Sequence, residues 1–194
     1  MNPQPGRRQQ GPLAPHPELW AWLEQGPKLR AILEDFYAVA LVDPRLAPFF
    51  HGVTRERIVD KQYSFLAQIF SGTRLYFGDR PRNAHHWMVI SDELFDYREQ
   101  LFADALDRAQ APAALREHWL EVHQVFRKQI VKAAAFPRRM AGVDLPLDGW
   151  RTEALLAGTM CDGCEGVLDV GMTASSHRRT GRTLCVACFE REAG

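Results

Sequence analysis

The chain has 194 residues, of which 46% are hydrophobic, and its 24 lysines and arginines are balanced by 24 aspartates and glutamates. This length allows one full core and one small appended unit, and the charge balance excludes overall attraction to nucleic acid or an anionic membrane. No apolar run approaches the roughly 20 residues that cross a bilayer, so we expect a cytoplasmic protein that makes no membrane contact.

The first 17 residues are rich in proline, glycine and glutamine. They carry two arginines, but no apolar stretch follows them, so they do not form a secretory signal. This composition predicts a disordered tail over residues 1–17.

Apolar residues from Leu19 to Lys132 recur every three or four positions, which is the period of an amphipathic helix. The stripes predict helices near 19–23, 29–40, 58–69, 94–106 and 115–130. Thr54 and Ser91 are candidate N-caps, and residues 72–83 read as a loop. No alternating strand pattern interrupts this region, so residues 18–136 are predicted to form an all-α domain.

Residues 137–160 contain prolines and glycines and are predicted to be a connector, with one short helix around Arg151 to Leu156. All four cysteines follow it, as two CxxC pairs separated by 20 residues: Cys161, Cys164, Cys185 and Cys188. Two such turns can complete a tetrahedron around Zn²⁺, and a segment without a core of its own gains its fold from the metal. We therefore expect a zinc-ribbon-like or treble-clef-like module over residues 161–194. Redox dithiols or a disulfide staple are the alternatives.

Two adjacent histidines, His85 and His86, lie in the stretch "RNAHHWMVISDELFDY". A lone histidine in a helical domain is usually a surface or structural residue. It becomes a candidate haem ligand only if the rest of a pocket is present: an aromatic side chain against the macrocycle, polar donors for a ligand and cations for the propionates. The chain offers these residue types in order, beginning with Tyr37, Phe50 and Gln62.

The combination "LEQG", "FYAVALVDPRLAPFF", "KQ", "YFG", "AH" and "FADAL" resembles the truncated haemoglobins, the short bacterial globins. The resemblance runs from Leu19 to Phe126. It implies a two-over-two helical sandwich that binds haem b and, through its iron, diatomic gases such as O₂ and NO.

The resemblance also implies roles for individual residues. His85 would be the proximal iron ligand, because Ala84 precedes it and Ile90 follows five residues later. His86 is one position out of register and remains the alternative. Tyr37 would donate a hydrogen bond to bound oxygen, with Gln62 as its partner, and these two are the candidate catalytic residues.

The remaining pocket residues follow from the same resemblance. Phe50 would wedge the haem plane, and Ile58 stands where other globins often have a distal histidine. Candidates for the pocket wall are Phe65, Leu66 and Trp87, and candidates for propionate partners are Lys61, Arg80 and Arg82. Taken singly, each of these residues could equally be ordinary core or surface.

Arg98 departs from the family pattern. The spacing from His85 directs Arg98 toward the distal pocket, where a buried arginine is costly unless it meets a propionate or an anionic ligand. The alternative is a rotated helix that turns Tyr97 inward and Arg98 outward.

The sequence thus favours a haem protein that holds O₂ or NO for redox detoxification, such as nitric-oxide dioxygenase or peroxidase-like chemistry, or for sensing. A reductase is a possible partner, and the chain could be a monomer or a dimer. In a second reading the zinc module contacts a protein or nucleic acid through the basic stretch "SSHRRTGR". In a third, the globin fold is a scaffold without haem.

Overall fold

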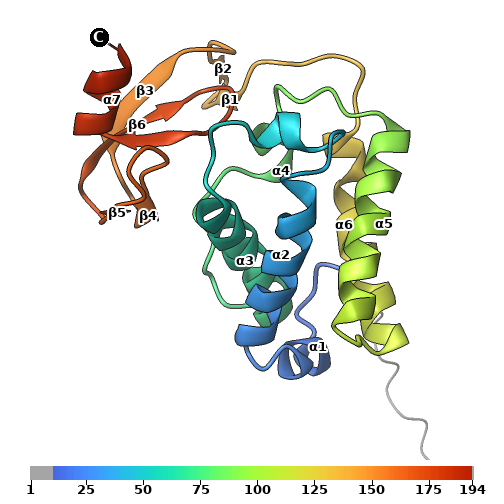
Figure 1. Ribbon diagram of the computed structural model, residues 1–194. Coiled ribbons are helices and arrows are strands. Elements are labelled where there is room, and N and C mark those ends of the chain that lie inside the picture. The colour runs from blue at the N-terminus through green and yellow to red at the C-terminus, as the bar shows by residue number, and fades with distance from the viewer. Residues whose placement is uncertain (1–10, 194) are drawn as a thin grey trace, which may run out of the picture.

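The computed structural model describes residues 11–193. Its helical part contains α1 (Pro17–Trp22), α2 (Pro27–Ala40), η1 (Ala47–Phe50), α3 (Arg55–Ser71), α4 (Pro81–Ala84), α5 (Asp92–Arg108) and α6 (Ala113–Ile130). Helices α2 and α3 form one pair and α5 and α6 a second, and α2 packs against both α3 and α5 (Figure 1). The predicted two-over-two globin sandwich is confirmed.

The apolar stripes meet between the two helix pairs. Trp119 of α6 is fully buried, with ring centroids 5.0 Å from Phe70 of α3 and 5.4 Å from Phe102 of α5. These edge-on and tilted contacts are the arrangements that aromatic rings prefer in a core. None of the helices in residues 11–193 is long and apolar enough to cross a membrane.

Helix ends show which predicted caps form. The Ser91 hydroxyl accepts a hydrogen bond from the Leu94 amide at 3.1 Å and so caps α5. Thr54 stands at the N-cap of α3, but its side chain makes no capping bond. Gly72 ends α3 in the left-handed region at φ 75°, where a side chain would also collide with Pro15.

The predicted disordered tail falls mainly on residues 1–10, which lie outside the described residues. The prediction is wrong for its last residues. The His16 amide donates to the Phe70 carbonyl at 3.0 Å, and its ring nitrogen accepts from the Leu19 amide at 3.0 Å. These bonds hold the chain against the end of α3, so order begins before α1.

The C-terminal part is rich in short strands. They are β1 (Arg139–Met140), β2 (Val143–Asp144), β3 (Trp150–Ala154), β4 (Thr159–Met160), β5 (Val167–Leu168), β6 (Thr173–His177) and β7 (Thr183–Cys185), followed by α7 (Val186–Ala193). An antiparallel sheet has the order β3-β6-β7, while β1 pairs with β2 and β4 with β5. We call residues 150–193 the cysteine module.

The short helix expected around Arg151 to Leu156 is wrong, because this stretch is strand β3. It pairs with β6 over five residues, and the Thr152 and Ser175 hydroxyls lie 2.7 Å apart. Pairing satisfies the backbone along the strand, whereas an isolated helix of this length is marginal in water. Residues 150–154 of the predicted connector therefore share a sheet with the cysteine-bearing segment.

Candidate functional site

A cavity of about 330 Å³ opens between the helices, beside the cysteine module. It brings together residues from α2, η1, α3 and the segment after α4 that are far apart in the sequence. The predicted site residues that line it are Tyr37, Phe50, Ile58, Lys61, Gln62, Phe65 and His85. His86 lines it as well.

The His85 ring has the orientation that a metal ligand needs. Its Nδ1 lies 2.8 Å from the Pro81 carbonyl oxygen, so the proton belongs on Nδ1 and Nε2 is left as an acceptor. Burial, above all, lowers the pKa of His85 to about 4, although the Pro81 carbonyl opposes the shift. The imidazole is therefore neutral at physiological pH, as ligation requires.

His86 has a similar local geometry, with Nδ1 2.8 Å from the Asn83 carbonyl oxygen. Its Nε2 is buried without a hydrogen-bond partner among the described residues. The charged surroundings of the two rings differ. The charges that act on His85 include Arg98 on the cavity wall, whereas those that act on His86 include the Arg138–Asp79 pair. Both rings line the same cavity, so the choice of His85 over His86 as the ligand stays a prediction from the family resemblance.

Tyr37 and Gln62 bring polar groups to a largely apolar wall. The Tyr37 ring is buried edge-on against Phe50, with centroids 5.8 Å apart. Within residues 11–193 neither the Tyr37 hydroxyl nor the Gln62 amide has a hydrogen-bond partner, and they do not bond to each other. Burial raises the pKa of Tyr37, against a smaller opposing effect of Arg98, so the phenol stays a donor. Both polar groups are therefore available to hydrogen-bond a ligand in the cavity.

Four predicted residues lie outside the cavity. Leu66 is fully buried in the core because it follows Phe65 on the helix and turns to the opposite side. Arg80 and Arg82 are exposed around α4, where the Arg82 guanidinium stacks 4.3 Å from the Phe136 ring. Trp87 lies beside Phe49, with centroids 5.9 Å apart, rather than on the cavity wall.

Arg98 lines the cavity, so the rotated-helix alternative is wrong. Tyr97 instead donates to Asp43 at 2.5 Å. Arg98 Nη1 lies 2.5 Å from Glu99 Oε1, and its guanidinium stacks 4.8 Å from the rings of Phe36 and Phe102. A carboxylate and two aromatic faces therefore compensate this partly buried cation.

Glu99 and His123 complete the group around Arg98. Burial raises the pKa of Glu99, but His123 and Arg98 together outweigh it and lower this pKa to about 2. Trp119 donates to His123 Nε2 at 3.2 Å, and His123 Nδ1 lies 2.9 Å from Arg98 Nη1 and 3.2 Å from Glu99 Oε1. The sequence suggested no function for His123, because its role depends on contacts between α5 and α6.

The cavity has more basic than acidic side chains. Its basic residues are Arg57, Lys61, Arg98, Arg138, Arg178 and Arg179, and its acidic residues are Asp79 and Glu99. Lys61 is exposed toward the cavity but crowded by protein elsewhere. This burial, followed by the Arg57 charge, lowers the pKa of Lys61 to about 8. The excess of cations fits a ligand with carboxylate groups, and haem has two.

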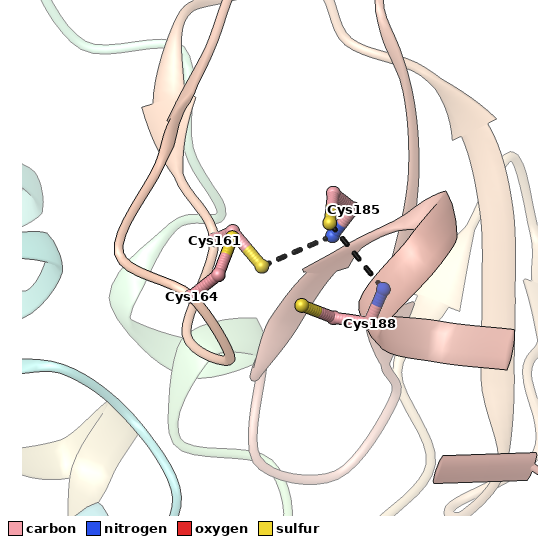
Figure 2. Close-up of side chains that lie close together, drawn as sticks. All are labelled: Cys161, Cys164, Cys185 and Cys188. Carbon is pink, nitrogen blue, oxygen red and sulfur yellow. Dashed lines mark hydrogen bonds between the residues drawn. The ribbon is translucent and has the colours of Figure 1, made fainter. Parts of the chain in front are cut away.

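The four cysteines meet in the cysteine module, where their sulfur atoms all lie within 4.8 Å of one another. Cys161 and Cys164 come from one loop, and Cys185 and Cys188 come from the corner between β7 and α7 (Figure 2). None of the four is joined in a disulfide within the described residues. The Cys185 amide donates to Cys161 Sγ at 3.2 Å, and bonds of this kind stabilise a thiolate. Four sulfurs at this spacing could hold one tetrahedral metal ion.

Asp162, inside the first CxxC turn, joins the module to α3. Its carboxylate is fully buried, with Oδ2 2.7 Å from Arg57 Nε and 2.6 Å from the Thr183 amide. Its Oδ1 accepts from the Thr54 amide at 2.7 Å. Thr54 and Arg57 belong to the start of α3, and Arg57 also lines the cavity. The side chain of Asp162 therefore connects the first CxxC turn to β7 and to the helix that bears Gln62.

Comparisons with known proteins agree with this architecture. Residues 23–132 match the sequence model of the bacterial-like globins. The Group 1 truncated hemoglobin GlbN of Mycolicibacterium paratuberculosis is 32% identical over 85 residues, which are 44% of this chain and 62% of that protein. The chain thus spans less than two thirds of that relative.

Solved structures give the same fold. Truncated hemoglobin from Tetrahymena pyriformis in its Fe(III) form superposes with a TM-score of 0.54 at 23% identity, over 58% of this chain and 97% of that one. Truncated oxygen-avid haemoglobin from Bacillus subtilis superposes with a TM-score of 0.51 at 24% identity, over 57% of this chain and 98% of that one. The matched sequence range 23–132 ends before the cysteine module begins.

Proposed function

The chain belongs to the bacterial-like globin family, which binds diatomic gases through haem, and from this premise we propose that the cavity holds one haem b with His85 as its axial ligand. When bound, the haem supplies an iron with one position open to O₂, NO or a related gas. The Pro81 carbonyl orients the His85 ring and holds its Nδ1 proton, so Nε2 would be the atom that ligates the iron.

The observation that carries this proposal is the pair of unmatched polar groups in the cavity. The Tyr37 hydroxyl is a protonated donor, and the Gln62 amide offers a second donor one helix away. Both would hydrogen-bond the gas ligand and slow its release, while Phe50, Ile58 and Phe65 exclude water. Slow release suits redox chemistry or sensing better than transport. We therefore favour a nitric-oxide dioxygenase-like or peroxidase-like role supported by a reductase.

The test is an absorption spectrum of the full chain with added haem. We expect a Soret band at one haem per chain, lost or strongly shifted in His85→Ala. His86→Ala is the matched control, because its ring is adjacent and similarly held, and it should keep the wild-type spectrum. A Soret band that responds only to His86→Ala would reassign the ligand. If the wild type with added haem shows no Soret band, the result would favour the haem-free scaffold.

We also propose that the four cysteines bind one Zn²⁺ and that this ion stabilises the cysteine module. Support comes from the four sulfurs, which all lie within 4.8 Å of one another in a segment whose buried apolar cluster is small. Elemental analysis should find one zinc per chain and none in Cys185→Ser/Cys188→Ser. Any other stoichiometry in the reduced wild type would contradict the assignment.

The alternative, a module that contacts nucleic acid, has weaker support. Arg178 and Arg179 of the basic stretch line the cavity, and Arg182 Nη1 lies 2.5 Å from Glu192 Oε1. Arg182 is thus paired with a carboxylate of the same module, whereas Arg179 is exposed. Salt-dependent binding of DNA or RNA by the full chain would support a module that contacts nucleic acid.

A further inference from the structure

The turn between β6 and β7 reaches the cavity from outside the globin domain. Four consecutive residues of this turn line the cavity: Arg178, Arg179, Thr180 and Gly181. We propose that this turn is part of the haem site, with Arg178 and Arg179 binding the haem propionates so that the cysteine module holds the acidic edge of the cofactor. This inference rests on the proposed function.

Several of the cations on the cavity wall are already paired with a carboxylate, but within the part of the chain that the structure describes these two arginines are not. Arg57 is neutralised by Asp162 at 2.7 Å, Arg98 by Glu99 and Arg138 by Asp79 at 2.8 Å. Among the described residues no carboxylate pairs with the three remaining cavity cations: Lys61, Arg178 and Arg179. A ligand with two carboxylates supplies the missing charge. Arginine also matches carboxylate geometry with two parallel donors.

The turn is held in shape by its own hydrogen bonds. The His177 amide donates to the Arg182 carbonyl at 2.7 Å, and the Gly181 amide donates to the His177 carbonyl at 2.8 Å. Gly181 adopts φ 70°, a conformation that favours glycine. The Arg178 amide donates to the Gly149 carbonyl at 2.7 Å, which ties the turn to the segment before β3. Binding of the haem propionates would therefore order the arginine side chains but not the backbone of the turn. The entropic cost of binding is lower for that reason.

Contacts with the globin domain fix where the turn lies. The Arg179 guanidinium stacks 5.0 Å from the Trp87 ring. Arg182 packs so closely on Gly52 that a Cβ there would lie 3.0 Å from Arg182 Cδ. Asp162 adds the buried bonds to Thr54 and Arg57. These contacts hold the turn at the cavity. Of the three propionate partners suggested by the sequence, Lys61 lines the cavity, whereas Arg80 and Arg82 lie outside it.

The experiment measures haem loss from the full chain to an excess of a haem-scavenging apoprotein. The variant is Arg178→Gln/Arg179→Gln. The control is Arg108→Gln/Arg116→Gln, which removes the same charge from surface ion pairs with Asp35 and Asp107. Loss of two partly exposed charge contacts should together raise the rate of haem loss about tenfold. We expect haem loss about tenfold faster in the variant and unchanged in the control.

Haem dimethyl ester, whose propionates are uncharged, separates the possible causes. With this probe the variant and the wild type should lose haem at the same rate. A difference that persists with the ester would overturn the propionate contact, and equal rates with ordinary haem would overturn the inference altogether. A wild type that takes up no haem would instead refute the proposed function. Circular dichroism melts of both variants check that each is folded.

Discussion

Replacing Asp162 with asparagine should detach the cysteine module from α3. The substitution keeps the volume but removes the charge that faces Arg57 at 2.7 Å, where both side chains are almost fully buried. It also puts an amide N–H₂ against one of the backbone donors, Thr54 N or Thr183 N. Breaking a buried ion pair from one side costs about 3–5 kcal/mol, because the other charge stays buried without a partner.

The assay is urea unfolding of the full chain followed by circular dichroism, with metal in excess. We expect Asp162→Asn to lower the free energy of unfolding by about 4 kcal/mol. The control Asp169→Asn removes an exposed carboxylate from the same module and should change it by less than about 0.5 kcal/mol. Arg57→Met combined with Asp162→Asn should cost less than the sum of the single changes, since both break one contact. A loss below about 1 kcal/mol for Asp162→Asn would refute the argument that this contact joins the two units.

Other predictions concern the cavity and the cysteines. Tyr37→Phe removes one hydrogen-bond donor and should speed O₂ dissociation about tenfold in stopped-flow measurements; an unchanged rate would exclude the role. Chelation of the reduced protein should make all four thiols reactive toward a thiol reagent, because sulfurs that ligate a metal react slowly. In haem-free protein the pKa of His85 lies near 4, below its ordinary 6.5. As the pH drops, His85 is protonated in the unfolded chain before it is protonated in the folded chain. The free energy of unfolding should therefore fall between about pH 6.5 and about pH 4. His85→Gln should flatten that slope.

The sequence was most informative where helical periodicity decides which side chains share a face. Tyr37 and Gln62 lie on apolar stripes of α2 and α3, so packing those stripes together also turns both polar groups toward one cavity. The placement of His85 after a short turn followed from the family resemblance. These residues belong to local patterns that can be recognised in one sequence without an alignment.

The residues that the sequence did not reveal depend on distant contacts. Thr54 and Asp162, whose bond joins the two units, are 108 residues apart. No spacing rule predicts that the basic turn at 178–181 faces the globin cavity. Strand β3 was missed for a related reason, because its strand form depends on pairing with β6.

The position of Asp162 would link the two proposed binding equilibria, those of haem and of zinc. Asp162 lies between Cys161 and Cys164 of the proposed zinc site, and its carboxylate also contacts the first turn of the helix that carries Gln62 and Lys61. If zinc tightens haem binding through this contact by some factor, haem must tighten zinc binding by the same factor. The fraction of chains with haem bound would then depend on the zinc concentration. In a zinc-starved cell the chain would bind haem more weakly.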